Sequence, residues 1–238
     1  MENESVKILA LLPAYNEEKH LEKVLTEVKK YISDILVVDD GSADKTAEIA
    51  RGTGVNVLSR GYNCGKGQSL KDGYTWALEN GYDAVIMLDS DGQHDPACIP
   101  DFVKKYEETK APLIIGARDY SKMPLRRRIP NKLGKALLSA CVGQDIKDNQ
   151  SGYRLLDREM MQQMLGSKQS GYHFEVEMIA IAIAEGHTIE WVPIPTVRRC
   201  CAATNAAVPS VRTAPCRPRS ATAARNASPN SRRNSTPQ

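Results

Sequence analysis

Asp89 and Asp91 stand two positions apart in the sequence DSDGQ, directly after the apolar run at residues 84–88. Two carboxylates at this spacing after a strand can turn toward one cation, and hard oxygen ligands suit Mg²⁺ or Mn²⁺. Gln93 can add an amide oxygen. A divalent ion at this position would hold a diphosphate and neutralise its charge as it leaves. The alternative is a solvated turn, because Asp-Gly pairs also mark turns.

Asp39 and Asp40 form a second polar cluster, after the apolar run at residues 35–38. A carboxylate at this position can accept hydrogen bonds from a nucleoside base or from ribose hydroxyls. Asp40 or Ser42 can instead cap the next helix. The two roles are compatible, with Asp39 binding a ligand and Ser42 capping the helix.

The sequence PAYNE at residues 13–17 forms a third cluster, after the first apolar run of the chain. Pro13 and Tyr15 could pack against a nucleoside base, and Glu17 could contact a ribose. Asn16 could cap the helix that follows. Three such clusters indicate a ligand site more strongly than any one alone.

The glycine-rich sequence GYNCGKG at residues 61–67 offers Lys66 as a contact for a diphosphate. It lacks the spacing and the GKS or GKT ending of a P-loop, so the alternative is a solvated turn. The four histidines show no metal-ligand spacing and are expected to be structural or at the surface. No GxSxG sequence is present, which disfavours a Ser-His-Asp hydrolase.

The elements that must position these residues alternate between strand and helix. Buried strands are expected at residues 6–12, 35–38, 55–58, 84–88 and 113–116. A helix is expected after Asn16, with Leu21, Val24, Leu25 and Val28 as its apolar positions, and further helices are expected over about residues 43–51 and 68–80 and from Pro96 onward. Such alternation predicts an α/β fold with a mostly parallel sheet flanked by helices. Because ligands bind beyond the carboxyl ends of such strands, the three clusters should meet at one rim.

The second half of the ordered chain is less regular. Three arginines, Arg126, Arg127 and Arg128, precede a helix expected over residues 131–142. A polar loop at 148–154 runs into a short strand, and a buried helix over 174–184 carries Glu175 and Glu177. A last strand is expected at 188–193.

The charge of the chain is divided unevenly. Among 238 residues, 41% are hydrophobic and 26% are charged, which is typical of a soluble globular protein. Residues 1–197 carry 24 Lys and Arg against 29 Asp and Glu, whereas residues 198–238 carry eight Arg and no acid. The net charge of +3 therefore does not indicate nucleic-acid binding. The longest apolar run has seven residues, so neither a membrane span nor a signal peptide is predicted, and a cytoplasmic location is the default.

The segment 198–238 contains no Leu, Ile, Met, Phe, Tyr or Trp and is expected to be disordered. It is interpreted as a basic arm or, preferably, as out-of-frame sequence, because the composition changes abruptly after Val197. The predicted organisation is one domain at 1–197, followed by the segment 198–238.

Eight motifs follow one another between Val6 and Val197: LLPAYNEE, ILVVDDGSADKT, GYNCGKGQSLKDG, VIMLDSDGQHDP, IIGAR, DNQSGYR, EVEMIA and EWVPIPTV. Together they resemble glycosyltransferase family 2, and within it the dolichol-phosphate mannose synthase and polyprenyl-phosphate glycosyltransferase branch. After Val197 the chain departs from the family's usual continuation.

The resemblance implies a GT-A fold, with a Rossmann-like, donor-binding half at about 1–118 and an acceptor half at about 119–197. It also implies a nucleotide-sugar donor such as GDP-mannose or UDP-glucose. It implies Mg²⁺ or Mn²⁺ at Asp89, Asp91 and Gln93. The residues expected around the donor nucleotide are Pro13, Ala14, Tyr15, Glu17, Val37, Asp39, Lys66, Asp89, Ser90 and Asp91. Arg118 falls where the family contacts a donor or acceptor phosphate.

The expected reaction is inverting, metal-dependent transfer of a hexose to a polyprenyl phosphate. A phosphate with a second pKa of about 6 is already a dianionic nucleophile at neutral pH, so no general base is required. The expected catalytic residues are Asp91, Arg118 and Asp148, and the expected acceptor contacts are Arg126, Arg127, Arg128 and Ser151. A basic cluster beside an amphipathic helix could contact a lipid phosphate at the cytoplasmic face of a membrane.

Two alternatives stay open. Transfer to a sugar or small-molecule hydroxyl would need a base, with Asp148 or Glu175 as candidates. A nucleotide-sugar-binding protein without turnover is the other alternative, because of the unusual C-terminal segment. Metal-dependent hydrolysis of the donor would distinguish an enzyme from a binding protein.

Overall fold

The computed structural model describes three stretches of the chain, residues 6–118, 146–167 and 174–195. Several sequence-based expectations lie outside these ranges: the contacts of Arg126, Arg127 and Arg128, the helix at 131–142, and the segment 198–238. Within the described ranges, strands and helices alternate as the sequence predicts.

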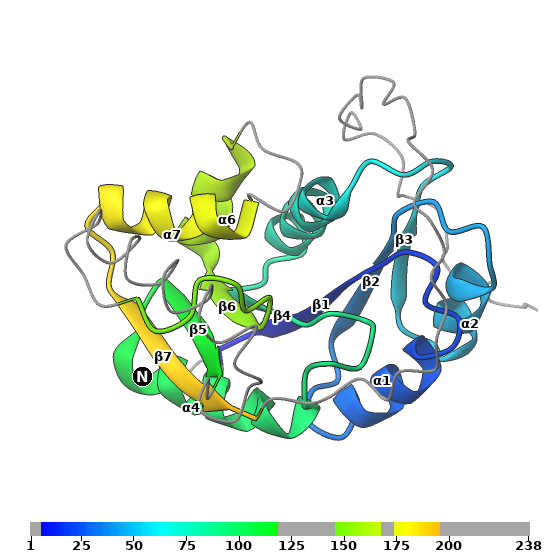
Figure 1. Cartoon of the computed structure of the whole chain (residues 1–238), viewed down its shortest axis with the longest axis horizontal. Coiled ribbons are helices and arrows are strands. Elements are labelled where there is room, and N and C mark those ends of the chain that lie inside the picture. Colours follow the sequence, from blue (N-terminus) through cyan, green and yellow to red (C-terminus); the bar gives the residue numbers. More distant parts are fainter. Residues whose placement is uncertain (1–5, 119–145, 168–173, 196–238) are drawn as a thin grey trace, which may run out of the picture. The chain divides into compact units, whose positions relative to one another are not determined.

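The described residues form one seven-stranded sheet (Figure 1). Its strands are β1 (Ile8–Ala14), β2 (Ile35–Asp39), β3 (Asn56–Ser59), β4 (Ala84–Met87), β5 (Leu113–Arg118), β6 (Arg154–Asp157) and β7 (Ile189–Ile194). The spatial order is β3-β2-β1-β4-β6-β5-β7. β6 runs antiparallel to β4 and β5, while the other neighbouring strands are parallel. The predicted α/β fold with a mostly parallel sheet is confirmed.

Helices cover both faces of this sheet (Figure 1). They are α1 (Leu21–Val28), α2 (Thr46–Gly52), α3 (Lys66–Glu79), the short 3₁₀ helix η1 (Pro96–Cys98), α4 (Ile99–Thr109), α6 (Arg158–Leu165) and α7 (Phe174–Ala184). α1, α2 and α4 pack on one face, and α3, α6 and α7 pack on the other. No helix in the described stretches is both long enough and apolar enough to cross a membrane.

The central strands are apolar along their whole length because both faces of the sheet are covered. In β1, Ala10 and Leu12 pack toward α1 and α4, whereas Leu9 and Leu11 pack toward α3 and α7. All four side chains are fully buried. Burying a leucine side chain stabilises a fold by about 1.5–3 kcal/mol relative to exposing it. These contacts fix the strands and leave the loops at their ends free to carry chemistry.

Two predicted helix caps are wrong. α1 begins at Leu21, well after Asn16, and α2 begins at Thr46, well after Ser42. Instead, the backbone N–H of Asn16 donates to Ser42 Oγ at 2.9 Å, and Asn16 Oδ1 accepts from the N–H of Ala43 at 2.9 Å. Because β1 and β2 are parallel neighbours, the loops that follow them touch, and each satisfies polar groups of the other.

Candidate functional site

The clusters predicted after β1, β2 and β4 meet at one edge of the sheet. β1 lies between β2 and β4. From β1 the chain continues to β2 and β3 on one side of the sheet, and β4 then follows on the other side of β1. Open α/β sheets bind ligands where the strand order reverses in this way. Ser90 Oγ donates to the carbonyl of Pro13 at 2.9 Å, and the N–H of Asp40 donates to the carbonyl of Ala14 at 2.9 Å. These bonds join the three loops, so the predicted rim exists.

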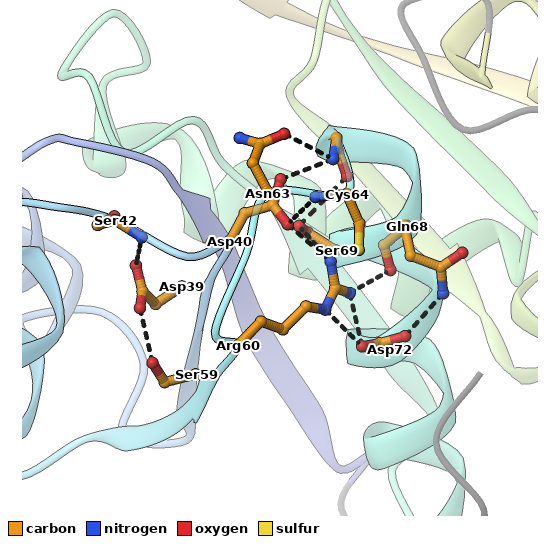
Figure 2. A network of polar contacts seen from close by, with 11 residues as sticks. Asp39, Asp40, Ser42, Ser59, Arg60, Asn63, Cys64, Gln68, Ser69 and Asp72 are labelled. Atoms are coloured by element: carbon orange, nitrogen blue, oxygen red, sulfur yellow. Dashed lines mark hydrogen bonds and ion pairs between the residues drawn. The ribbon is translucent and has the colours of Figure 1, made fainter. Parts of the chain in front are cut away.

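Asp39 lies at the carboxyl end of β2 and is 2% exposed. Its Oδ1 accepts from the N–H of Ser42 at 3.1 Å and its Oδ2 from Ser59 Oγ at 2.7 Å (Figure 2). The carboxylate is therefore held in a fixed orientation.

The other residues expected at the nucleoside differ in exposure. Tyr15 is 48% exposed, so its ring is accessible to a ligand. Glu17 is half-buried, and its N–H donates to Thr46 Oγ1 at 2.8 Å. Val37 is fully buried in the core beside β1, so its side chain does not belong to the exposed rim.

Arg60 holds the loop after β2 against the start of α3 (Figure 2). Its Nη1 donates to Asp40 Oδ1 at 2.7 Å, and its Nε and Nη2 donate to Asp72 Oδ2 at 2.9 and 2.5 Å. Asp40 also accepts the N–H groups of Cys64 and Gly65, at 2.9 and 2.8 Å. Arg60 was not predicted as a site residue, although a charged residue two positions after the strand expected at 55–58 was a usable indication.

Lys66, the first residue of α3, lies between two carboxylates. Its Nζ is 2.6 Å from Asp89 Oδ1 and 2.7 Å from Glu175 Oε1. Burial alone would lower the pKa of Lys66, but the charges of Asp89 and Glu175 outweigh burial and raise it. Burial opposes ionisation of Asp89, yet the charge of Lys66 keeps the pKa of Asp89 below its ordinary value. Lys66, the residue expected to contact a diphosphate, therefore carries a full positive charge beside the DSDGQ sequence.

His94 contacts Asp89 from the other side. The N–H of Asp89 donates to His94 Nδ1 at 3.0 Å, so a neutral ring carries its proton on Nε2. The imidazole stacks on the Tyr153 ring with centroids 5.0 Å apart. Burial lowers the pKa of His94, which favours the neutral ring. The histidine is structural, as expected, and the residue that it supports is Asp89.

Asp91 and Gln93 lie in the turn after β4. The backbone N–H of Gln93 donates to Asp91 Oδ1 at 2.9 Å, and its side-chain amide also donates to Asp91. Among the described residues, no three His, Cys, Asp or Glu side chains form a group that could hold a metal ion. Mg²⁺, however, usually takes only one or two carboxylates and completes its shell with water and substrate phosphates. Asp89, Asp91 and the Gln93 amide oxygen fit an ion that binds together with a diphosphate.

Arg118, the last residue of β5, forms an ion pair with Asp148. Arg118 Nε lies 2.7 Å from Asp148 Oδ2, and Arg118 Nη2 lies 2.9 Å from Oδ1. Asp148 is fully buried and also accepts the N–H of Gln150 at 3.0 Å. Its carboxylate therefore orients Arg118. Ser151, an expected acceptor contact, is fully buried, and its Oγ accepts the N–H of Tyr153 at 3.4 Å.

The antiparallel direction of β6 explains why the loop that contains Asp148 and Ser151 lies at the same edge of the sheet as the loops after β1, β2 and β4. Because β6 runs opposite to β4, the loop before β6 lies at the same edge as the loop after β4. Arg154, the first residue of β6, is fully buried and donates to the carbonyls of Ser151 at 2.8 Å and Glu175 at 2.6 Å. Sequence analysis missed Arg154, although an arginine that opens an apolar strand was an indication.

Comparison with known proteins identifies the family. The model of glycosyl transferase family 2 matches residues 10–165. The chain is 31% identical over 208 residues to undecaprenyl-phosphate mannosyltransferase of Micrococcus luteus, covering 82% of this chain and 85% of that protein. It is 30% identical over 208 residues to polyprenol monophosphomannose synthase of Mycolicibacterium smegmatis, covering 81% of this chain and 78% of that protein.

Solved structures agree on the fold. Glucosyl-3-phosphoglycerate synthase from Mycobacterium tuberculosis, in complex with UDP, superposes with a TM-score of 0.67 at 22% identity, over 82% of this chain and 72% of that chain. That synthase has also been crystallised with Mn²⁺, UDP and glucosyl-3-phosphoglycerate. The sheet and its two helical layers are thus a GT-A fold, and the chain belongs to glycosyltransferase family 2 and is a glycosyltransferase.

Proposed function

We propose that this enzyme transfers a hexose from a nucleotide-diphospho-sugar to a polyprenyl phosphate, with Mg²⁺ or Mn²⁺ at Asp89, Asp91 and Gln93. The observation that carries the proposal is the ion pair between Lys66, the first residue of α3, and Asp89, which follows β4 at the edge where the strand order reverses; Lys66 Nζ lies 2.6 Å from Asp89 Oδ1. A cation and a carboxylate at this edge suit a metal-bound diphosphate. The names of the two bacterial relatives support a polyprenyl-phosphate acceptor and favour mannose, hence GDP-mannose over UDP-glucose.

Donor binding uses the rim described above. Asp39 accepts hydrogen bonds from the nucleoside. The exposed Tyr15 ring and Pro13 pack against the base. Lys66 donates to a diphosphate oxygen. The divalent ion supplies further charge neutralisation for the departing nucleoside diphosphate.

Transfer is a single displacement with inversion. An oxygen of the acceptor phosphate forms a bond to the anomeric carbon while the bond from that carbon to the diphosphate oxygen breaks. Because the acceptor is already a dianion, no proton has to be removed. Arg118, oriented by Asp148, neutralises phosphate charge, so the residues act mainly by positioning and electrostatics.

The acceptor side completes the proposal. We assign the lipid phosphate to Arg126, Arg127 and Arg128, with Ser151 in the supporting loop, at the cytoplasmic face of a membrane. Replacing all three arginines with glutamine should weaken use of the lipid phosphate far more than metal-dependent donor binding. Equal loss of both, or loss of neither, would remove this segment from the acceptor site.

The test is a donor and acceptor panel with mass spectrometry of the products. GDP-mannose and UDP-glucose are each incubated with a polyprenyl phosphate or with free sugars as the acceptor, in the presence of Mn²⁺ or of EDTA. We expect a glycosylated lipid phosphate that forms only with metal. Donor binding without any product would indicate a binding protein, and transfer only to free sugars would indicate the hydroxyl-acceptor reaction.

A further inference from the structure

Gly152 lies against the three charged groups at the centre of the site. A methyl group at its Cβ position would stand 3.0 Å from Asp89 Oδ2, 3.1 Å from Lys66 Nζ and 3.2 Å from Glu175 Oε1. Gly152 does not have a left-handed φ, so its backbone could accept alanine. An alanine at this position would therefore have to displace the charged groups by a few tenths of an ångström, whereas the backbone conformation sets no such restriction.

Lys66 is held by groups from different parts of the chain. Asp89 follows β4, and Glu175 lies in the first turn of α7. Both carboxylates accept from the ammonium, at 2.6 and 2.7 Å. An ammonium has three N–H donors, so the hydrogen bonds among the described residues leave one donor for a phosphate oxygen. The Lys66 side chain is 31% exposed, which gives a ligand access to it.

Arg154 connects the two acceptor-side groups. Its guanidinium donates to the carbonyl of Ser151, next to Gly152, and to the carbonyl of Glu175. One buried cation thus fixes the distance between the loop that carries Gly152 and the helix that carries Glu175.

We propose that Glu175 and Gly152 are positioning residues for Lys66. Glu175, with Asp89, holds the flexible lysine side chain in the orientation that a donor diphosphate needs, and Gly152 leaves the space in which the three groups meet. The inference rests on the proposed function, because it assigns Lys66 to the donor diphosphate. Neither residue needs to touch the substrate.

Gly152→Ala is the first test, on the full 238-residue chain. We expect the added methyl to displace Lys66 and weaken binding of GDP-mannose or UDP-glucose with Mn²⁺ by on the order of tenfold or more in calorimetry. The matched control is Gly52→Ala, at a glycine without left-handed φ whose added methyl would meet no atom within 4 Å. Wild-type donor affinity in a folded Gly152→Ala variant would overturn the inference.

A double-mutant cycle is the second test. If Glu175 acts through Lys66, Lys66→Gln and Glu175→Gln should each weaken donor binding, and the double variant should bind no more weakly than Lys66→Gln. Additive losses would show that Glu175 acts independently of Lys66 and would overturn the inference. Glu175→Asp keeps the charge and should bind the donor more tightly than Glu175→Gln. If only the volume of the side chain mattered, Glu175→Asp would bind the donor more weakly than Glu175→Gln, because aspartate is shorter.

Melting temperatures separate folding defects from binding defects. If Glu175→Gln does not fold, the cycle is run with Gly152→Ala and Lys66→Gln, with the same expectation of no added loss. A wild-type chain that binds neither nucleotide sugar would defeat the proposed function. If the wild-type chain binds one of the nucleotide sugars but the losses of donor affinity in the double-mutant cycle are additive, only the positioning roles of Glu175 and Gly152 are wrong.

Discussion

The guanidinium of Arg118 meets the carboxylate of Asp148 at two points, Nε to Oδ2 at 2.7 Å and Nη2 to Oδ1 at 2.9 Å. The Asp148 side chain is fully buried, while that of Arg118 is 24% exposed. A two-point pair holds the arginine in one plane as well as at one distance. The end of β5 and the loop before β6 therefore present Arg118 in a single orientation.

Asp148→Asn should destabilise the protein because it removes the buried carboxylate that accepts two hydrogen bonds from the Arg118 guanidinium. We expect the free energy of unfolding to fall by about 3 kcal/mol, the lower end for a buried pair, because Arg118 is partly exposed. Urea denaturation measures the change. Glu107→Gln, at an exposed carboxylate of α4, is the control and should change stability by less than about 0.5 kcal/mol. An Asp148→Asn variant as stable as the control would contradict the structural role of the pair.

Asp91→Ala should abolish metal-dependent donor binding without unfolding the domain, because the side chain lies in a turn beyond β4. Calorimetry of the nucleotide sugar with and without Mn²⁺ measures the effect, and Asp101→Ala, at an exposed carboxylate of α4, is the control. Unchanged metal dependence in Asp91→Ala would remove Asp91 from the metal site.

Arg60→Lys keeps the charge but replaces a planar group that reaches Asp40, Asp72 and the Gln68 carbonyl. A single ammonium cannot reproduce this geometry. We expect a stability loss of about 1–3 kcal/mol, the range for hydrogen bonds to charged groups, and weaker nucleotide binding. Arg51→Lys, at an exposed arginine of α2, should be neutral in both measurements. If Arg60→Lys and Arg51→Lys have the same stability and the same nucleotide affinity, the hydrogen bonds of Arg60 do not hold the loop after β2 in place for nucleotide binding.

Cys98 should react slowly with alkylating reagents. Burial, reinforced by the charges of Asp95 and Asp101, raises the pKa of its thiol from 9.0 to about 11. The folded state therefore binds the thiol proton more tightly than the unfolded state. This contribution to stability is complete below pH 9 and is lost as the pH rises to about 11. At pH 8, peptide mass spectrometry should find much slower labelling of Cys98 by iodoacetamide in native protein than in urea, and equal rates would refute the shift.

The sequence predicted most of the fold because buried parallel strands appear as continuous apolar runs. Residues 84–88 and 113–116 were found in this way. The short strand after the loop at 148–154 was predicted, and it is β6. Its place in the sheet order and its antiparallel direction were not predicted, because an apolar pattern does not say which strand pairs with which, and α6 was not assigned. The caps assigned to Asn16 and Ser42 failed for a related reason, since their partners lie across a loop–loop contact.

The residues that the sequence indicated either lie at the end of a strand or belong to the glycine-rich sequence at 61–67. Asp39, Asp89 and Lys66 were found from local sequence, and the structure brings them to one rim. The partners of these residues were not found, because they lie far away in the chain. Lys66 and Glu175, for example, are separated by 109 positions. Whether the predicted residues bind donor, metal and acceptor stays a prediction that the experiments above test.

The antiparallel strand also has a consequence for the order of folding. Ala84 in β4 pairs with Asp157 in β6, 73 positions later, whereas β1 and β2 are joined by a short helical connection. Closing a long loop costs more chain entropy than forming local contacts, so distant pairings tend to form late. We expect stopped-flow refolding to show helix formation first, with nucleotide binding recovered in a slower phase. A newly made chain would then become competent for its donor only after residue 157 has emerged and paired with the strand made much earlier.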